Sequence, residues 1–431
     1  MRSVGSKVTK FSAPTFHYDA VTAVEGSQLG RVDCVARPIG GGSGDVYDFD
    51  FPPQGDGVYL NMNDMVIHGK AKVTRANGDD LVAADNVAII NNFGQAAFSS
   101  VEAKINDFSL PGSGFTDSNI KSYISNILTI STADEGVLQN QLFYPDPAGK
   151  LNTTNDTTNS GFKARKDLIA TSNEFDFTAP ICCDFLKSST HLGPGNKLSL
   201  RFYRAHNNQL LMSPIGNAYK VVFTSLQVLY SRIITNIPRP LSESHIIPHS
   251  ELMRFPMAAN TTSIMMNVQS GGKLPRAVIV FFIDTMALTG SYTHNMFHLE
   301  HLNLSSLNLR VNGRSVPADA LKPDFTNKVV ARELNHLFQN VGVTRMGRGG
   351  FIDREKFLDG YTIFPFDLSP DKCSGYHIHE TFEGTIEVEA TCSGMNTATT
   401  GFAYLIWDME VNIDRSSGAP GMHSLAYISA P

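Results

Sequence analysis

The sequence predicts an all-β protein made of two consecutive eight-stranded jelly-roll β-sandwiches (a double jelly roll), with short helices in the loops. Three observations support this fold class. Short apolar segments, several with a two-residue alternation, recur along the whole chain; turn signals rich in Gly, Pro and Asn separate them; and a proline-rich break lies near the middle. A length of 431 residues also suggests two domains of about 200 residues each.

The segment 275–317 shows the strand pattern most clearly. Residues 277–283 (AVIVFFI) form an unbroken apolar run that is too short to span a membrane and suits a strand buried on both faces. Further on, Leu307, Leu309 and Val311 alternate with polar residues, which predicts a strand with one buried face. The pair Asn312-Gly313 then predicts a type I′ hairpin turn.

Other segments share this apolar or alternating pattern and are predicted to be strands. They are residues 59–74, 87–105 (interrupted at Asn91-Asn92), 174–177, 197–203 and 219–234 in the first half, and 263–268, 361–368, 385–391 and 403–414 in the second. Pro365 places the segment 361–368 at a sheet edge or a bulge, because proline has no N–H for a central strand. Asn77-Gly78 predicts a second hairpin turn.

Two segments predict short helices and one predicts a long loop. Residues 119–130 carry apolar side chains at helical spacing, and we expect this stripe to be a packing face; its members are Ile120, Tyr123, Ile124, Ile127 and Leu128. Residues 332–340 (RELNHLFQN) predict the other helix. Residues 146–161 (DPAGKLNTTNDTTNSG) are polar and of low complexity, so we expect a mobile surface loop.

The break at residues 236–240 (NIPRP) contains two prolines, which cannot both lie in a central strand. We therefore expect an N-terminal arm over residues 1–44, a first jelly roll over 45–237, a second over 238–415 and a C-terminal tail over 416–431. The glycines of residues 40–44 suit a flexible hinge; no Lys-Ser/Thr follows, so a phosphate-binding loop is not indicated. No residue-level repeat relates the two halves.

Composition narrows the class of protein. Hydrophobic residues make up 42% of the chain and charged residues 18%, which suits large buried cores. The net charge of −6 argues against a protein that condenses nucleic acid. The cysteines are few and scattered and include no CxxC, which favours a reducing compartment over a disulfide framework; they are Cys34, Cys182, Cys183, Cys373 and Cys392. No apolar stretch near the N-terminus predicts a secretory signal, and we expect no membrane span.

Histidine patterns raise the question of a metal site. His377 and His379, followed by Glu383, have the first-motif spacing of cupins, which are also jelly rolls. The glycine expected before the pair is missing, since position 371 is Asp, and His423 misses the second-motif spacing. We therefore interpret these histidines as exposed residues at a strand end.

A second histidine group lies in the loop after residue 290. His294, His298 and His301 would share one face of a helix, but in a loop between strands that spacing loses its meaning, so we expect solvated or interface histidines. The vicinal Cys182-Cys183 predict two partly buried thiols, because adjacent cysteines rarely form a disulfide.

The segment 345–350 (RMGRGG) is a small basic loop that could contact nucleic acid, but in an acidic chain a surface turn is the better interpretation. The sequence contains no nucleophile elbow, Walker loop or HExxH helix. It therefore predicts no catalytic, cofactor-binding or metal-binding residue and no cofactor.

Several strings resemble the major capsid protein, or hexon, of Polinton/Maverick and adintovirus-like elements. The resemblance is densest at residues 359–361 (DGY) and 364–371 (FPFDLSPD). It also includes, in the second half, residues 274–278 (LPRAV), 281–284 (FFID), Gly290, 295–298 (NMFH), 307–313 (LNLRVNG), 323–325 (PDF) and 337–338 (LF). In the first half it is looser, at Asn91-Asn92 before residues 98–101 (FSSV), at 142–146 (LFYPD), and at 198–200 leading to 210–212. The ordered similarity spans residues 45–415 and leaves out the arm and the tail.

The resemblance implies a double jelly-roll capsid protein of the adenovirus-hexon lineage. Such a protein would form pseudo-hexameric homotrimers that tile an icosahedral shell around double-stranded DNA. Its partners would be further copies of itself, neighbouring capsomers, and penton and minor capsid proteins, with no sequence-specific nucleic acid. It would be located in the virion after synthesis in the host cytoplasm or nucleus. A cupin-like metal-dependent enzyme and a carbohydrate-binding β-sandwich protein are the alternatives from other classes.

Overall fold

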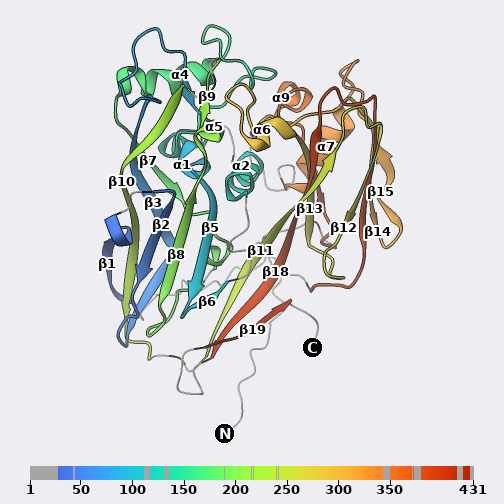
Figure 1. Cartoon of the computed structure of the whole chain (residues 1–431). Helices are drawn as coiled ribbons and strands as arrows, with labels where there is room; N and C mark the ends of the chain where they lie inside the picture. The colour runs from blue at the N-terminus through green and yellow to red at the C-terminus, as the bar shows by residue number, and fades with distance from the viewer. Residues whose placement is uncertain are drawn as a thin grey trace, which may run out of the picture.

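The structure is a computed structural model that describes residues 28–427 except 42–43, 111–116, 131–134, 189, 215, 217, 239, 241, 343–349, 371, 373–379 and 415–420. Two β-sandwiches stand side by side in it (Figure 1). The first contains two four-stranded antiparallel sheets. One has the order β1 (Gln28–Ala36), β10 (Tyr219–Thr235), β3 (Val58–Arg75), β7 (Phe175–Pro180); the other has β2 (Val46–Phe51), β8 (Leu198–Arg204), β5 (Phe98–Ile105), β6 (Phe108–Ser109).

The second sandwich is built in the same way. One sheet has the order β11 (Ser242–Met257), β18 (Thr399–Asp414), β13 (Ala277–Asp284), β16 (Phe364–Asp367), and β19 (Gly421–Tyr427) also pairs with β18. The other has the order β12 (Ser263–Val268), β17 (Ile386–Cys392), β14 (Leu304–Val311), β15 (Arg314–Leu321). A small pair, β4 (Ala88–Ile89) and β9 (Leu211–Met212), lies outside the main sheets of the first sandwich.

The two sandwiches share one strand topology. If the eight sandwich strands of each half are counted in chain order, leaving out β4, β9 and β19, both halves have one sheet ordered 1-8-3-6 and the other 2-7-4-5. This interleaving of the first and last strands is the jelly roll. The predicted fold class, two consecutive eight-stranded jelly rolls, is confirmed, and the likeness between the halves lies in topology rather than in residues.

The strands follow the sequence patterns closely. In β13 every residue from Val278 to Ile283 is at most 6% exposed, as expected for a strand buried on both faces. Leu307 and Leu309 of β14 are buried, and the hairpin to β15 turns at Asn312 (φ 51°) and Gly313 (φ 75°), the two positive φ angles of a type I′ turn. Pro365 lies in β16, which pairs only with β13 at the edge of its sheet.

The turn at Asn77-Gly78 is present but opens no second strand. Beyond it, among the described residues, one bridge leads back to β3, between Thr74 and Asp80; β3 pairs instead with β10 and, over residues 66–71, with β7. The hairpin prediction was therefore correct for the turn and wrong for the strand pairing.

Short helices connect the strands. Both predicted helices are confirmed, as α2 (Ser118–Thr129) and α7 (Ala331–Asn340). The other α-helices among the described residues are α1 (Phe93–Ala96), α3 (Glu135–Leu138), α4 (Ser160–Leu168), α5 (Asn207–Leu210), α6 (Thr285–Thr289) and α9 (Arg354–Leu358). Side-chain caps start three of these: Asn159, Asp284 and Asp353 accept backbone N–H bonds in the first turns of α4, α6 and α9.

The polar segment 146–161 is an irregular loop up to the start of α4, with Lys150, Asn155 and Thr157 among its exposed residues, but some of its side chains point inward. Asp146, Leu151 and Asn159 are buried. The Asn159 side chain donates to the carbonyls of Lys150 (2.9 Å) and Thr153 (3.1 Å), so the segment folds around its own polar groups. Asn159 thus satisfies part-buried backbone carbonyls, a role that composition alone cannot distinguish from exposure to water.

Both ranges expected to be an arm and a tail contain a strand. β1 pairs with β10 from Gln28 to Ala36, and β19 pairs with β18 from Gly421 to Tyr427. Sequence analysis assigned neither strand. Between the sandwiches, β10 ends at Thr235 and β11 begins at Ser242, on either side of the two prolines.

Candidate functional site: the contact between the two sandwiches

The hydrophobic core runs without a break from one sandwich into the other. Helix α2 lies between them in Figure 1. Its Tyr123 ring stacks on Phe297 from the second sandwich, with ring centroids 4.0 Å apart and planes 11° from parallel. Both side chains are buried. Aromatic stacking and burial therefore connect the halves at the centre of the molecule.

A buried ionic cluster lies beside this stack. Lys121 of α2 donates to the Ser250 carbonyl of β11 (2.8 Å) and lies 3.7 Å from the Asp184 carboxylate. Asp184 accepts bonds from both the backbone N–H and the hydroxyl of Ser250 (2.8 Å each). The Lys121 and Asp184 side chains are only 6% and 3% exposed. Three elements distant in sequence are thus tied together by charges that have little contact with water.

The cluster also sets the protonation of its members. Burial would raise the pKa of the Asp184 carboxyl, but the ammonium groups of Lys121 and Lys187 and the Ser250 hydrogen bonds lower that pKa below its usual value. Burial would lower the pKa of Lys121, but Asp184 raises it. Both groups therefore stay charged at neutral pH.

Further polar contacts extend along β11. Asp117, preceding α2, pairs with Arg254. At the other end of the strand Glu243 accepts from the Gly193 N–H (2.9 Å), and His245 is 2.7 Å from the Thr190 hydroxyl. The first strand of the second sandwich is thus bonded to the first sandwich near both of its ends.

The loops of the two halves interlock at the end of the molecule near α4 and α9 (Figure 1). Arg165 of α4 pairs with Asp146 at 2.8 Å, both side chains being 1% exposed, and also donates to the Ile89 carbonyl (2.9 Å). The Tyr361 hydroxyl from the second half donates to the Asp146 carbonyl at 2.6 Å. Burial raises the pKa of the Tyr361 phenol, so it remains a hydrogen-bond donor.

Of the three loop histidines, His298 has a defined electrostatic role. Its Nδ1 lies 3.1 Å from Glu300 and 2.9 Å from the Asn152 amide nitrogen of the first half, and its Nε2 lies 3.6 Å from Asp359. Burial would lower the pKa of His298, but hydrogen bonds to Asp359 and Glu300 raise it to about 9. Protonated His298 therefore supplies a positive charge between two carboxylates where the two halves meet.

The other two histidines have separate surroundings. His294 lies within hydrogen-bond distance of the Ser291 and Thr293 hydroxyls (3.2 and 3.0 Å), and His301 stacks on Phe325 with centroids 4.6 Å apart. Burial lowers the pKa of His301. In the part of the chain that the structure describes, no group of three or more His, Cys, Asp or Glu side chains could hold a metal ion.

The remaining motifs divide between described and undescribed residues. His377 and His379, and the basic residues 345–349, lie outside the described residues. Cys182 and Cys183 are free thiols; burial raises the pKa of both, that of Cys183 to about 11. Neither thiol therefore has the thiolate character of a reactive cysteine.

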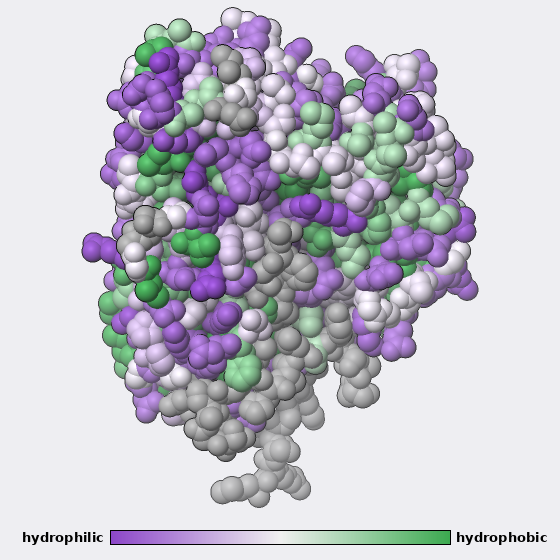
Figure 2. Space-filling model, viewed as in Figure 1, coloured by the Kyte–Doolittle hydropathy of each residue, from purple (hydrophilic) through white to green (hydrophobic). Residues whose placement is uncertain are grey.

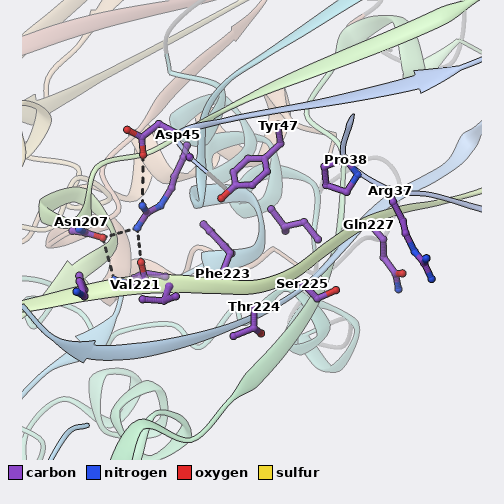
Figure 3. A pocket seen from close by; sticks show the side chains of 15 residues that line it. Arg37, Pro38, Asp45, Tyr47, Asn207, Val221, Phe223, Thr224, Ser225 and Gln227 are labelled. Carbon is purple, nitrogen blue, oxygen red and sulfur yellow. Dashed lines mark hydrogen bonds and ion pairs between the residues drawn. The ribbon is translucent and has the colours of Figure 1, made fainter. Parts of the chain in front are cut away.

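Apolar side chains also reach the surface (Figure 2). Leu29, Val32 and Val35 of β1 are among the exposed ones, as are Val137 of α3 and Met265 of β12. No helix among the described residues is long and apolar enough to cross a membrane. A groove of about 730 Å³ runs beside β10 (Figure 3).

Comparison with solved structures identifies the same fold elsewhere. A chain in the cryo-EM structure of the Sputnik virophage matches 100% of this chain and 95% of its own, with a TM-score of 0.65 and 13% identity. The mavirus major capsid protein matches 100% and 97% (TM-score 0.55, 9% identity). PBCV-1 VP54, in a crystal structure fitted into a reconstruction of Sputnik, matches 94% and 99% (TM-score 0.54, 12% identity).

No protein-family model and no curated protein sequence matches the chain. At these identities the structural matches define the fold alone. The double jelly roll is matched over 94–100% of this chain and 95–99% of the three neighbours. The particular lineage within that fold is part of the proposal that follows.

Proposed function

We propose that this chain is a viral major capsid protein whose homotrimers form pseudo-hexameric capsomers that tile an icosahedral shell around double-stranded DNA. The observation that supports it is the pair of jelly rolls of identical topology, fused through one continuous core. The mavirus major capsid protein matches the chain over 100% of its length with a TM-score of 0.55. The residues near 361–371 that resemble Polinton and adintovirus hexons favour that lineage within the proposal.

The physical reason for a trimer is the doubling of the sandwich within one chain. Three copies around a three-fold axis would place six sandwiches of similar shape in a ring, which gives a hexagonal outline suited to tiling. Such a capsomer needs each chain to behave as one rigid body. The buried contacts of Tyr123, Asp184 and Asp146 between the halves meet that need.

The proposal assigns the function to interfaces and gives the chain no catalytic role and no cofactor. Its partners would be two further copies, then neighbouring capsomers, penton and minor capsid proteins. Residues 45–237 together with β1 and residues 238–415 together with β19 would supply the two lobes, and the rest of residues 1–44 and 416–431 the contacts between subunits. The location would be the virion.

Light scattering coupled to gel filtration, followed by electron microscopy of the full-length protein, tests the proposal. We expect one species of three times the chain mass of 47.0 kDa across a concentration series, and hexagonal particles or shells in the images. A subunit contact of roughly 2,000 Å² or more would hold the trimer together on dilution.

Three results would contradict the proposal. A monodisperse monomer at high concentration would exclude the capsomer. About one equivalent of zinc, iron or manganese per chain, removed together with an activity, would favour the cupin-like enzyme. Glycan binding by a monomer would favour the carbohydrate-binding alternative.

A further inference from the structure

The two sandwiches differ in how much of the last strand is hydrogen-bonded to the first strand. In the second sandwich β11 pairs with β18 along its whole length, from Ser242 opposite Asp414 to Met257 opposite Thr399. In the first, β1 pairs with β10 only over residues 228–235 of β10. Among the described residues, no strand pairs with the same edge of β10 over residues 219–227.

The vacant edge is bounded by residues that the structure describes. Beyond Ala36 the chain turns away from β10 at Arg37-Pro38, and proline has no N–H to continue the ladder. At the far end Val221 already has partners: its N–H donates to Asn207 (3.1 Å) and its carbonyl accepts from Arg204 (2.7 Å). Residues 222–227 of β10 therefore form what we call the open edge.

The open edge lines the groove beside β10. Figure 3 shows Thr224, Ser225 and Gln227 along one wall, with Pro38 and Tyr47 across from them. Thr224 and Ser225 are exposed although they lie in an inner strand of the sheet. An unpaired strand edge with room beside it is a template for an added strand.

The charges around the groove are mainly positive. Arg37, Arg204 and Lys220 line it, and Asp45 is the acidic side chain among the lining residues. Arg37 is exposed at the end where β1 leaves β10. A segment that fits should therefore be extended, rich in β-branched residues and acidic.

One stretch of this chain has that chemistry. Residues 19–25 (DAVTAVE) place Val and Thr between two acidic ends. We propose that residues 19–25 of a second copy add to the open edge of β10 as a strand, completing the edge that β11 completes in the second sandwich. Each copy would donate one such strand and accept one, an arrangement that closes in a ring.

The length of the chain argues against donation within one copy. Gln28 lies opposite Thr235, at the far end of β1 from the open edge, and the strand from Gln28 to Ala36 spans roughly 26 Å. Glu25 precedes Gln28 by three peptide steps, which reach about 11 Å at most. The segment 19–25 of the same chain cannot then lie along the open edge as a unit, whereas that of another copy can.

This inference rests on the proposed self-assembly and adds detail to it. Disulfide trapping in the full-length protein distinguishes failure of the strand addition from failure of the self-assembly. Ser225→Cys, in the middle of the open edge, is combined in turn with Val21→Cys, Thr22→Cys and Ala23→Cys, in the middle of the donated segment. Directly paired strands bring Cα atoms to about 5 Å, within disulfide range. Thr224→Cys replaces Ser225→Cys if that variant misfolds.

We expect at least one pair to give about tenfold more disulfide-linked dimer and trimer on mild oxidation than Ser225→Cys with Ser12→Cys, because only docked segments are held at high effective concentration. Mixing the two single-cysteine variants should give the same dimer, with residues 21–23 and 225 linked in its mass spectrum. Arg37→Glu should slow the linkage about twofold to fivefold, and Arg314→Glu, an exposed charge change on β15, should not.

Three outcomes would overturn the inference. Linkage within one chain, seen as a fast-migrating monomer, would assign the edge to the copy's own segment. Dimer yields equal to the Ser12→Cys control would mean that nothing specific docks there. A trimer by light scattering without any linkage would refute this inference alone, whereas a monomer would refute the proposed self-assembly as well.

Discussion

Replacing Asp184 by asparagine should destabilise the protein by about 3–5 kcal/mol at pH 7. The substitution keeps the shape and one acceptor for Ser250, but it removes the negative charge that lies 3.7 Å from Lys121. Because the Lys121 side chain is almost fully buried, its ammonium would be left without a counter-charge, and removing one partner of a buried pair costs that amount. The loss should be visible as a lower midpoint of guanidinium unfolding, followed by circular dichroism.

Two further variants make this prediction specific. Asp319→Asn removes a carboxylate that is 64% exposed and pairs with Arg332 at 3.0 Å, so we expect a much smaller loss, because water screens this pair. Adding Lys121→Met to Asp184→Asn should recover at least half of the lost stability, because the unpaired charge is then absent. The reasoning is refuted if Asp184→Asn matches Asp319→Asn, or if the added Lys121→Met makes the protein less stable still.

Other expectations concern pH and backbone geometry. Since the pKa of His298 is about 9 in the folded state and roughly 6.5 unfolded, its stabilisation of up to about 3 kcal/mol should be complete below pH 6.5 and lost as pH rises through 9; unfolding midpoints of His298→Gln should lack this slope. Gly161→Ala should cost about 1–3 kcal/mol, because its Cβ would clash with the Pro145 carbonyl oxygen, whereas Gly136→Ala, also helical and with open space around it, should be neutral or stabilising in the same thermal melts. Gly313→Ala should lower stability by about 1 kcal/mol through its positive φ; an unchanged melting temperature would contradict the type I′ turn.

Much of the fold could be predicted because it depends on local pattern. The apolar run of β13, the alternation of β18 and the turn at Asn312-Gly313 each specify a strand or a turn within a few residues. β1 was missed because most of its residues are exposed, with only Cys34 and Ala36 half-buried at its end, so its sequence shows little alternation. A strand that is held mainly by hydrogen bonds along one edge, with little burial of its faces, leaves little hydrophobic pattern in the sequence.

The contact between the sandwiches could be predicted only in part. The apolar stripe of α2 was recognised as a packing face, and Ile120, Tyr123, Ile124 and Ile127 are indeed buried. Lys121 on the same helix is buried as well, because a second body covers the face that a surface helix would turn to water. The partners of Lys121 lie more than fifty residues away, and one sequence contains no information on which distant polar groups meet.

The strand order has a consequence for how the chain folds during synthesis. In both sandwiches the last strand, β10 or β18, inserts between the first and the third, so neither sheet can close until its final strand has left the ribosome. Until then β1 and β3, or β11 and β13, expose unpaired edges and apolar faces. Such long-range pairing makes folding slow. A chain of this topology should therefore depend on chaperones at two separate moments of translation, once for each jelly roll.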